Sequence, residues 1–237
     1  RALDEAQSPR QQVLQLRQSE NIDVDALVRT DKFLMRLPLE LDAEQLWKRF
    51  SPKVRNQVRK AEKSGLTAEQ GGRELLPEFY RIHSENMRDL GRPSHHPRLF
   101  EAVVDAFPAE ARLFVVRLEG TAVGAALTLA NDDRLEVPWA SSLKRYNRLC
   151  VNHLLYWTIL EHACRAGFEM FHFGRSTRDS GTYHFKKQWG AEPQQLFWYY
   201  LGSSQTAAVA PDESYGWGTR VWQRLPLWLT RRLGPVL

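Results

Sequence analysis

The most informative alternation of apolar and polar positions lies in the C-terminal third of the chain, between residues 168 and 190. Residues 168–173 are rich in aromatic side chains and are followed by a glycine, which is typical of a buried strand and a turn. After a polar loop, Ser180 or Thr182 can cap a helix of about two turns, and Gly190 can close it. The pattern therefore predicts a strand, a loop and a short helix, in that order.

Two adjacent lysines on this short helix fall in different surroundings. At about 100° per residue, one face of the helix is shared by Thr182, Phe185 and Trp189. Lys186 borders that face, whereas Lys187 points away from it. Partial desolvation beside aromatic rings strengthens the field of a cation and raises the cost of burying it. If the protein has a catalytic cation, we expect it to be Lys186; the alternative is that this side chain only runs past the rings to reach water.

The earlier part of the chain reads as a strand followed by helices. Ser51-Pro52 begins a helix that runs to Gly65, in which Val54, Val58 and Ala61 form the buried stripe. The other elements predicted here are a polar helix in residues 1–21, strands over 32–39 and 66–72, a helical turn after Asp42, and helices over 73–90 and 97–107.

The second half predicts an antiparallel meander and a buried helix. Its strands cover 111–118, 122–130 and 134–141, the helix covers 151–166, and an aromatic strand covers 195–201. This order of elements is that of an α/β (α+β) fold with a mixed sheet splayed at its centre, the GNAT-like acyl-CoA N-acyltransferase fold. In such a fold the reaction takes place beside the splay, and the loop after the central strand holds the donor's phosphates.

The loop over residues 145–153 differs from that of a conventional acetyl-CoA enzyme. Such an enzyme has R/Q-x-x-G-x-G/A there, so that backbone amides can approach the pyrophosphate. This loop contains no glycine, and its bulky side chains argue against ordinary acetyl-CoA use. Arg145, Arg148 and Asn152 remain candidate donor-binding residues with a different phosphate geometry.

The helix over 52–64 carries a basic stripe opposite its buried face. Arg55, Arg59 and Lys63 lie on that stripe at i, i+4 and i+8. It is either a solvated basic face or a surface that binds phosphate through arginine forks. The two adjacent histidines of His95-His96-Pro97 are potential metal ligands. The sequence has no third ligand at a suitable spacing, so we interpret this stretch as a loop or the start of a helix.

Composition and charge set wide limits. The 237 residues are 43% hydrophobic and 11% aromatic, which is ample for a folded core. A net charge of +5 and a pI near 9.3 suit a polyanionic partner such as RNA, a phosphorylated carrier or an anionic membrane face.

Cys150 and Cys164 are too few for a disulfide scaffold or a metal cluster, which favours a cytoplasmic location. The chain shows no signal-peptide or membrane-span pattern, and its first residue is Arg, so we expect a fragment or a processed protein.

Several blocks of sequence resemble the FemAB family, most closely the branch associated with PEP-CTERM protein sorting and exopolysaccharide loci. The resemblance covers about residues 30–201 and is carried by S-P-K-V-R-N-Q-V-R-K-A at 51–61, V-P-W-A-S at 137–141, N-H-L-L-Y-W at 152–157, and F-G-R-S-T with G-T-Y-H-F-K-K-Q-W-G within 173–190. Members of that family resemble two GNAT-like halves in tandem. The resemblance implies that residues 1–29 are the end of a missing N-terminal half, that 30–201 form the transferase domain, and that 202–237 are a linker and a basic C-terminal segment.

The resemblance also implies an activity. Better-understood relatives transfer an amino acid from aminoacyl-tRNA to the amine of a cell-wall (peptidoglycan) precursor peptide, without a bound cofactor. The lysine implicated there in catalysis maps to Lys186. We expect a fixed cation to offset the negative charge that develops on the carbonyl oxygen. His172 departs from the aspartate expected in this branch, and no general base stands out among His172, Asp179 and His184.

Further residues are candidates for substrate binding. Anionic substrate groups would be positioned by Arg55, Arg59 and Arg175, and the cleft would be lined by Trp139, Ser141, Ser176 and Tyr183. Each has a structural alternative: Arg175 can cap the strand end in an ion pair, and the two aromatic residues can belong to the core. Residues 216–237 form a basic amphipathic segment that is interrupted by Pro226. This segment either docks on the missing half or binds the anionic inner face of the cytoplasmic membrane.

Three functions stay open from the sequence. The first is a FemAB-like acyl or aminoacyl transferase acting on a cell-envelope precursor or a glycan. The second is a GNAT enzyme that uses acyl-CoA or acyl carrier protein, against which the glycine-free loop argues. The third is a polyanion-binding module that keeps the fold without turnover.

Overall fold

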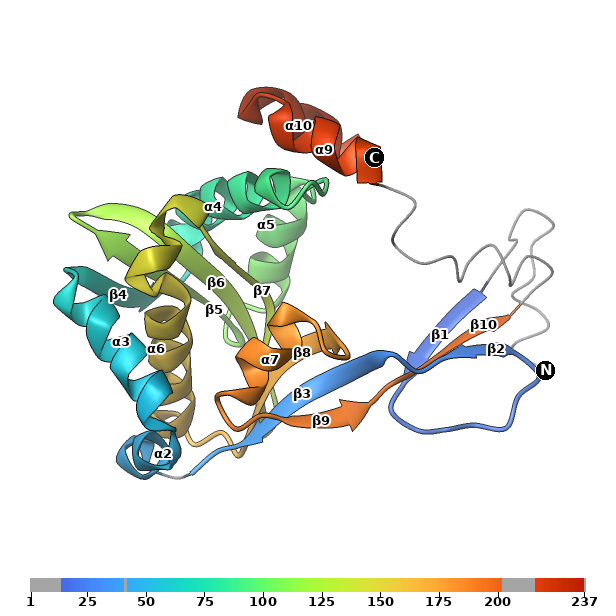
Figure 1. Ribbon diagram of the computed structural model, residues 1–237, viewed down its shortest axis with the longest axis horizontal. Helices are drawn as coiled ribbons and strands as arrows, with labels where there is room; N and C mark the ends of the chain where they lie inside the picture. Colours follow the sequence, from blue (N-terminus) through green and yellow to red (C-terminus); the bar gives the residue numbers. More distant parts are fainter. Residues whose placement is uncertain (1–13, 41, 202–215, 237) are drawn as a thin grey trace.

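The computed structural model describes residues 14–40, 42–201 and 216–236. A seven-stranded sheet lies at its centre, with helices on both faces (Figure 1). Helices α2 (Ala43–Arg49), α3 (Pro52–Lys63) and α6 (Val151–Arg165) cover one face, and α4 (Leu76–Asp89) and α5 (Pro97–Ala106) cover the other. The mixed α/β architecture predicted from the sequence is confirmed.

The sheet is antiparallel except at its centre. Its strands run in the order β4-β5-β6-β7-β8-β3-β9. Their bounds are β4 (Leu66–Gly71), β5 (Ala111–Leu118), β6 (Thr121–Asn131), β7 (Arg134–Ser142), β8 (Met170–Thr177), β3 (Lys32–Pro38) and β9 (Glu192–Gln195). The predicted meander is therefore β5, β6 and β7, and β3 lies between two strands that follow it far along the chain.

The splay predicted for the centre of the sheet lies between β7 and β8. These parallel strands pair only from Arg134 with Met170 to Glu136 with His172. Beyond that point β7 continues to Ser142 and β8 to Thr177 without pairing to each other. Two diverging strands leave a wedge that side chains or a ligand can fill.

Local capping explains where the helices begin. The Ser51 hydroxyl accepts a hydrogen bond from the amide of Val54, and Pro52 occupies the first helical position. The Ser180 hydroxyl accepts from the amide of Tyr183 at 3.2 Å and starts helix α7 (Gly181–Lys187). Gly190 closes the following turn with a φ of 84°, a conformation that costs glycine little.

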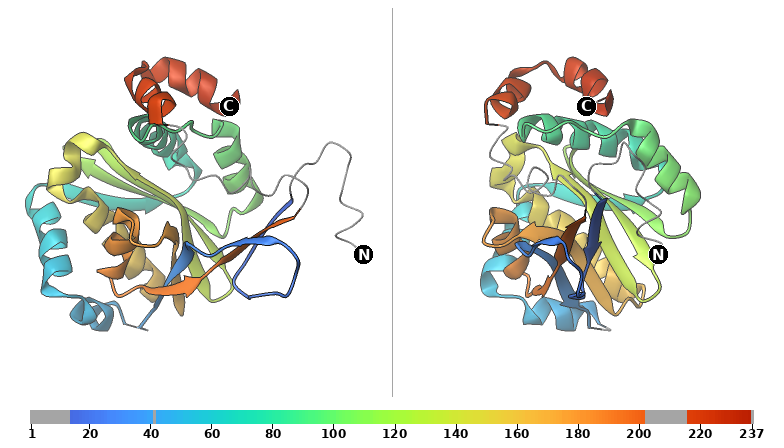
Figure 2. Two further views of the ribbon diagram at one scale, coloured as in Figure 1. Left: turned by 45° about the vertical axis from the view of Figure 1, so that its right-hand side comes forward. Right: turned by 90° about the vertical axis from the view of Figure 1, so that its right-hand side faces the viewer.

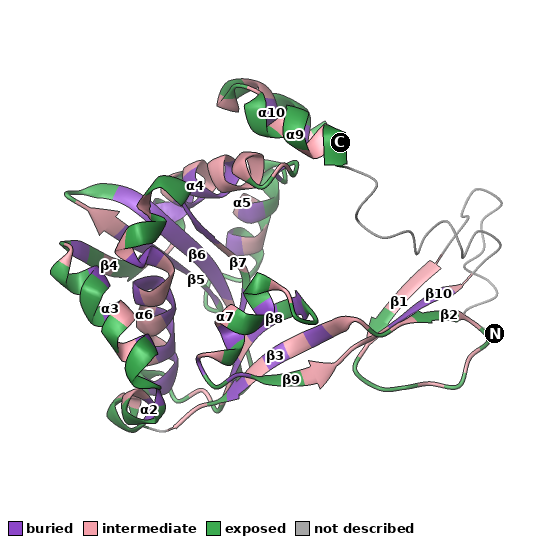
Figure 3. Ribbon diagram, viewed as in Figure 1, coloured by how far each residue is buried: buried purple, intermediate pink, exposed green. Residues whose placement is uncertain are grey.

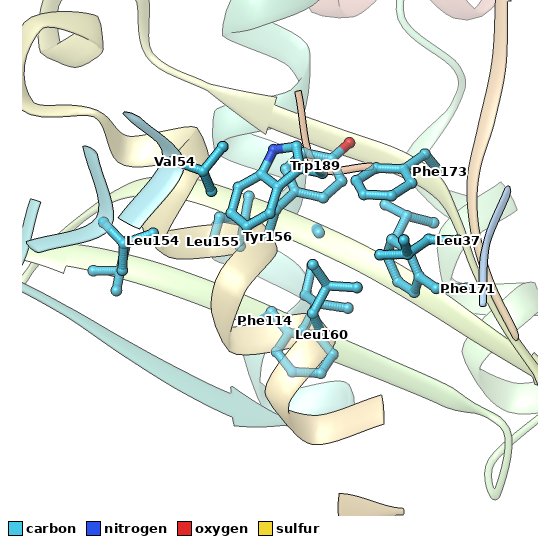
Figure 4. Close-up of a cluster of buried hydrophobic side chains, with 14 of the residues drawn as sticks. Leu37, Val54, Phe114, Leu154, Leu155, Tyr156, Leu160, Phe171, Phe173 and Trp189 are labelled. Atoms are coloured by element: carbon cyan, nitrogen blue, oxygen red, sulfur yellow. The ribbon is translucent and has the colours of Figure 1, made fainter. Parts of the chain in front are cut away.

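Two hydrophobic cores hold the layers together. The larger lies between the sheet and α2, α3 and α6, and includes Val54, Val58 and Ala61 as predicted. Figure 4 shows part of it, with Trp189 beside Tyr156 and Phe173. The smaller lies between the sheet and α4 and α5, around Phe79 and Phe100. The central strands are accordingly the most buried part of the chain (Figure 3).

The strands differ from the prediction in three places. Residues 14–18, expected in a helix, form strand β1 (Leu14–Gln18) because they pair with the aromatic strand β10 (Phe197–Leu201). With β2 (Leu27–Arg29) these make a separate three-stranded ribbon that projects from the main sheet (Figure 1). Strand β8 passes through Gly174 to Thr177, because β3 supplies partners beyond the glycine. The strand predicted over 195–201 is present as β10, which begins at Phe197 and lies in the ribbon, whereas β9 in the main sheet was not predicted.

The C-terminal segment packs against this domain. Helices α9 (Gly216–Arg224) and α10 (Leu227–Leu233), with the turn η4 (Gly234–Val236), lie over α4 (Figure 2). The Gln223 amide donates to the carbonyl of Asp89, and the Arg231 guanidinium donates to the Ser84 hydroxyl. The linker predicted over 202–215 lies outside the described residues. In the ranges that the structure covers, every helix is too short or too polar to cross a bilayer.

Candidate active site

A cavity of about 870 Å³ opens where β7 and β8 diverge. Its wall on β7 is formed by residues 136–140 and its wall on β8 by residues 173–177. Helix α7 contributes Thr182 and Lys186, and the segment after α4 contributes Leu90, Arg92 and His95. The remaining lining residues are Lys32, Tyr156, Ser180 and Trp198. The splayed strands thus frame a cleft beside the sheet that is large enough for a ligand.

Lys186 is buried at the β8 wall of this cavity. Its side chain is only 7% exposed, whereas its neighbour Lys187 is exposed. The ammonium donates hydrogen bonds to the carbonyl oxygens of Gly174, at 3.2 Å, and Arg175, at 2.8 Å. A protonated lysine has three N–H donors, so one remains for a ligand in the cavity.

Burial, together with the positive charge of Arg175, lowers the pKa of Lys186 to about 8, while Glu136 acts in the opposite sense. Removing water from around an ammonium disfavours its charged form. The group is still mostly protonated at neutral pH. It therefore supplies a fixed positive charge in surroundings where that charge is weakly screened.

Glu136 is a residue of this site that sequence reasoning missed. It sits on β7 opposite His172, at the last paired position before the splay. Desolvation raises the pKa of Glu136, against the opposing effect of Arg175 and Lys186. Its side chain lines both the main cavity and a second cavity of about 720 Å³, which is also lined by Glu110, Asp132, Arg134 and His172. In the sequence, Glu136 is only the polar position of an alternating strand, and only its place at the splay makes it notable.

The outer wall of the cavity is basic and aromatic. Trp198 of β10 has Arg17, Lys32 and Arg175 against its ring, with the charged groups 4.1, 5.7 and 5.2 Å from the ring centroid. The Lys32 ammonium donates to the Thr177 hydroxyl at 2.7 Å. The cations of the lining outnumber its one carboxylate, Glu136, so the cavity suits an anionic ligand.

The structure brings four of the sequence-predicted site residues to the cavity: Trp139, Arg175, Ser176 and Lys186. Ser176 is 5% exposed, and its hydroxyl has no hydrogen-bond partner among the described residues. A buried hydroxyl without a partner is costly, and a ligand in the cavity would satisfy it.

Ser141 and Tyr183 lie near the cavity without lining it. Ser141 is buried, and its hydroxyl accepts a hydrogen bond from the Asn86 amide and lies 3.4 Å from Nδ1 of His83. Tyr183 packs edge-on against Phe33, with ring centroids 6.0 Å apart. Both side chains have a structural role here.

Arg55 and Arg59 lie on α3, on the far side of the larger core, and do not line the cavity. The Arg59 guanidinium lies over the ring of Trp47, 5.7 Å from its centroid. Arg145 and Arg148 belong to the turn η2 (Lys144–Leu149), which precedes Asn152 of α6. Arg145 pairs with Glu85, and none of these three residues lines the cavity. Roles of these five residues in binding stay predictions.

The other candidate acid–base residues are also separate from Lys186. His172 is half-buried and lines the second cavity, and burial and nearby arginines lower its pKa. Asp179 and His184 are exposed and line neither cavity. His96 caps α5, because Nδ1 of its ring accepts from the amide of Arg98 at 3.1 Å.

Comparison with known proteins identifies the fold. The acetyltransferase (GNAT) domain family matches residues 48–187, which is more than half of the chain. The chain belongs to this family. The enzyme class that follows is acyltransferase, and the GNAT fold predicted from the order of the elements is confirmed. No curated protein matches the chain.

Solved structures share this GNAT fold. FemX is 18% identical, with a TM-score of 0.63 over 75% of this chain and 63% of FemX. The C-terminal domain of an Agrobacterium fabrum protein described as a lysylphosphatidylglycerol synthetase is 13% identical, with a TM-score of 0.60 over 80% of this chain and 66% of that chain. L-PGS from Bacillus licheniformis is 14% identical, with a TM-score of 0.53 over 84% of this chain and 68% of that chain. The chain thus spans less than two thirds of the first two, and the specific FemAB branch stays a prediction.

Proposed function

We propose that this GNAT domain transfers an acyl or aminoacyl group from an activated ester or thioester to an amine on a cell-envelope precursor. The observation that carries the proposal is the buried ammonium of Lys186 at the splay of β7 and β8. A positive charge held there by two backbone carbonyls is already in place before any substrate enters. Pre-arranged charge of this kind is often the largest single contribution to catalysis.

The chemistry is an acyl exchange on the carbonyl carbon of the donor. A neutral amine attacks that carbon, the C–N bond forms, and the carbonyl oxygen becomes negative. The free N–H of Lys186 would donate to that oxygen. As the C–O or C–S bond to the leaving group breaks, the oxygen returns to a carbonyl and the leaving group takes up a proton.

Glu136 is our candidate for the group that removes the amine's proton. Its raised pKa makes its carboxylate a better base than an ordinary glutamate. It lines both cavities, so an acceptor amine that enters through the second cavity would meet it beside a donor held in the first. The acidic side chains of the second cavity, Glu110 and Asp132, suit a cationic acceptor before it loses its proton.

The donor proposed is an aminoacyl-tRNA or another donor that differs from acyl-CoA. The segment between β7 and α6 contains no glycine, and it folds as a short turn in which Arg145 is paired with Glu85. Backbone amides obstructed by side chains cannot wrap a pyrophosphate closely. The likeness of the fold to FemX is compatible with a cell-envelope role.

The test offers the chain a labelled aminoacyl-tRNA, acyl-CoA or acyl carrier protein, together with an envelope precursor peptide that has a free amine. Mass spectrometry would detect the new amide. We expect transfer from the aminoacyl donor, with K186M lowering kcat about 10²- to 10³-fold because one oxyanion donor is lost. Lys187, its exposed neighbour on the same helix, gives the matched control, and K187M should retain the wild-type rate.

Three results would count against the proposal. Transfer from acyl-CoA alone would assign a conventional GNAT reaction. A folded K186M variant with kcat within about tenfold of wild type would remove the role given to the ammonium. Binding of the donors without turnover by either protein would favour a polyanion-binding module.

A further inference from the structure

The C-terminal helical pair has an unusual surface. Of the ten large hydrophobic residues that are exposed in the described ranges, five lie in residues 216–236. They are Trp217, Val221, Trp228, Leu233 and Val236, and their exposed fractions run from 38% to 80%. Two tryptophans exposed by 78% and 67% are costly in water, and such clusters of apolar side chains mark interaction surfaces.

The exposed residues of α9 share one face of the helix. Trp217, Arg220, Val221 and Arg224 follow the spacing i, i+3, i+4 and i+7, and all four are exposed. Other residues of α9 contact the domain: the Thr219 side chain lies against Gly91, and the Gln223 amide donates to the Asp89 carbonyl. On α10, Trp228 and Arg232 are likewise exposed one turn apart, while Arg231 is bonded to Ser84. The domain therefore covers one side of the pair and leaves the apolar and basic side open.

The charge of this segment has one sign only. Residues 216–236 contain four arginines and no aspartate or glutamate. Apolar side chains interleaved with arginines on one helix face are the pattern of a helix that lies in the interface of a membrane with anionic lipids.

The segment that follows α4 contacts both the helical pair and the main cavity. The segment after α4 contributes Leu90, Arg92 and His95 to the cavity wall. The same segment contacts the helical pair, because a Cβ on Gly91 would lie 2.2 Å from the Thr219 side chain and Gly234 lies against Ser94. Leu90, which lines the cavity, is itself 53% exposed.

We propose that the outward face of α9 and α10 binds the surface of a membrane that contains anionic phospholipid. Trp217 and Trp228 insert at the level of the headgroups, and the arginines contact lipid phosphates. Because the segment between Leu90 and His95 contacts both the helical pair and the cavity, this docking fixes the position of the cavity relative to the lipid surface. The proposal stands apart from the reaction proposed above, since it concerns where the chain binds and not what it transfers.

The test is co-sedimentation of the chain with phosphatidylcholine vesicles, without or with roughly 30% phosphatidylglycerol. We expect binding to the anionic vesicles and weak binding to the neutral ones. Loss of two arginines in R220Q/R224Q should lower the partition coefficient about 30-fold, since each basic residue contributes about fivefold. W217S/W228S should lower it by more than about tenfold, and should abolish the quenching of tryptophan emission by brominated lipid.

Matched controls lie on other faces of the domain. K60Q/K63Q removes two exposed charges from α3, and L99S removes an apolar side chain of α5 that is 39% exposed. Both should bind vesicles as the wild type does. All of these side chains are exposed, so each variant should fold, which circular dichroism would verify.

Three outcomes would overturn the proposal. One is equal binding to neutral and anionic vesicles or none to either. A second is loss of binding in K60Q/K63Q but not in R220Q/R224Q. The third is a dimer in light scattering that W217S/W228S converts to a monomer, which would assign the face to a second copy of the chain. None of these outcomes depends on whether the transfer reaction is found.

Discussion

The effect of replacing Lys186 by methionine on stability tests whether the amine is buried, independently of its role in turnover. The side chain is 7% exposed, and its pKa lies at about 8 in place of 10.5. That difference corresponds to about 3 kcal/mol between the charged and neutral forms. The folded protein binds this proton less tightly than the unfolded chain does. Stability therefore rises with pH between the two pKa values, because there the unfolded chain holds more protons.

Methionine has a similar length and no charge, so the variant lacks this contribution. Relative to K186M, the wild type should gain about 3 kcal/mol in the free energy of unfolding from neutral pH to pH 10.5. The absolute difference between the two proteins also contains the lost hydrogen bonds to Gly174 and Arg175. Only the change of this difference with pH measures the effect of desolvation on the ammonium of Lys186.

Urea unfolding of both proteins at a series of pH values would measure this change. Lys187 is exposed on the same helix, so K187M should show a difference from wild type that stays constant with pH. A difference between wild type and K186M that changes by less than about 1 kcal/mol would refute the reasoning, because the amine would then be solvated.

Three further predictions follow from the same geometry. The kcat/KM of the transfer reaction should fall above about pH 8, because Lys186 loses its proton there, and K186R should move this fall to higher pH. A kcat/KM that does not change over this pH range would contradict the role of the charge. Gly174→Ala should lower the free energy of unfolding by about 1–2 kcal/mol. The reason is that φ is 74° at this residue and the new Cβ would lie 3.4 Å from the Val137 carbonyl oxygen. A urea denaturation curve identical to that of the wild type would argue against this strain. His83 is buried and its pKa is lowered from 6.5 to about 4, so the free energy of unfolding of the wild type should fall by about 3 kcal/mol as the pH drops through that range. In His83→Phe the free energy of unfolding should fall by less. Wild type and variant profiles of stability against pH that run parallel would contradict this prediction.

The parts of the fold that could be predicted from the sequence depend on local signals. Ser51, Ser180 and Gly190 act on atoms within a few residues, so their roles as caps follow from spacing alone. The burial of Lys186 followed from the face it shares with neighbouring aromatic residues. Its hydrogen-bond partners did not, because they are carbonyls of strand β8, which is separated from Lys186 by the loop before α7.

The parts that could not be predicted depend on partners far away in the chain. Residues 14–18 have a weak pattern of their own, and they are a strand only because β10 lies beside them. Glu136 alternates with buried neighbours as any exposed strand residue does, and its place at the splay is set by where β8 stops pairing with β7. Arg145 looked free to hold a phosphate, but Glu85 of α4 pairs with it.

The position of β3 has a consequence for synthesis of the chain. This strand is synthesised long before both of its neighbours, β8 and β9, which lie far along the chain. Its buried side chains, Phe33, Met35 and Leu37, must stay unburied in the nascent chain until those partners emerge. Expression of residues 48–187 alone would leave β8 without this neighbour and expose a strand edge on which other chains can pair. A productive expression boundary must therefore include β3 and β9 together.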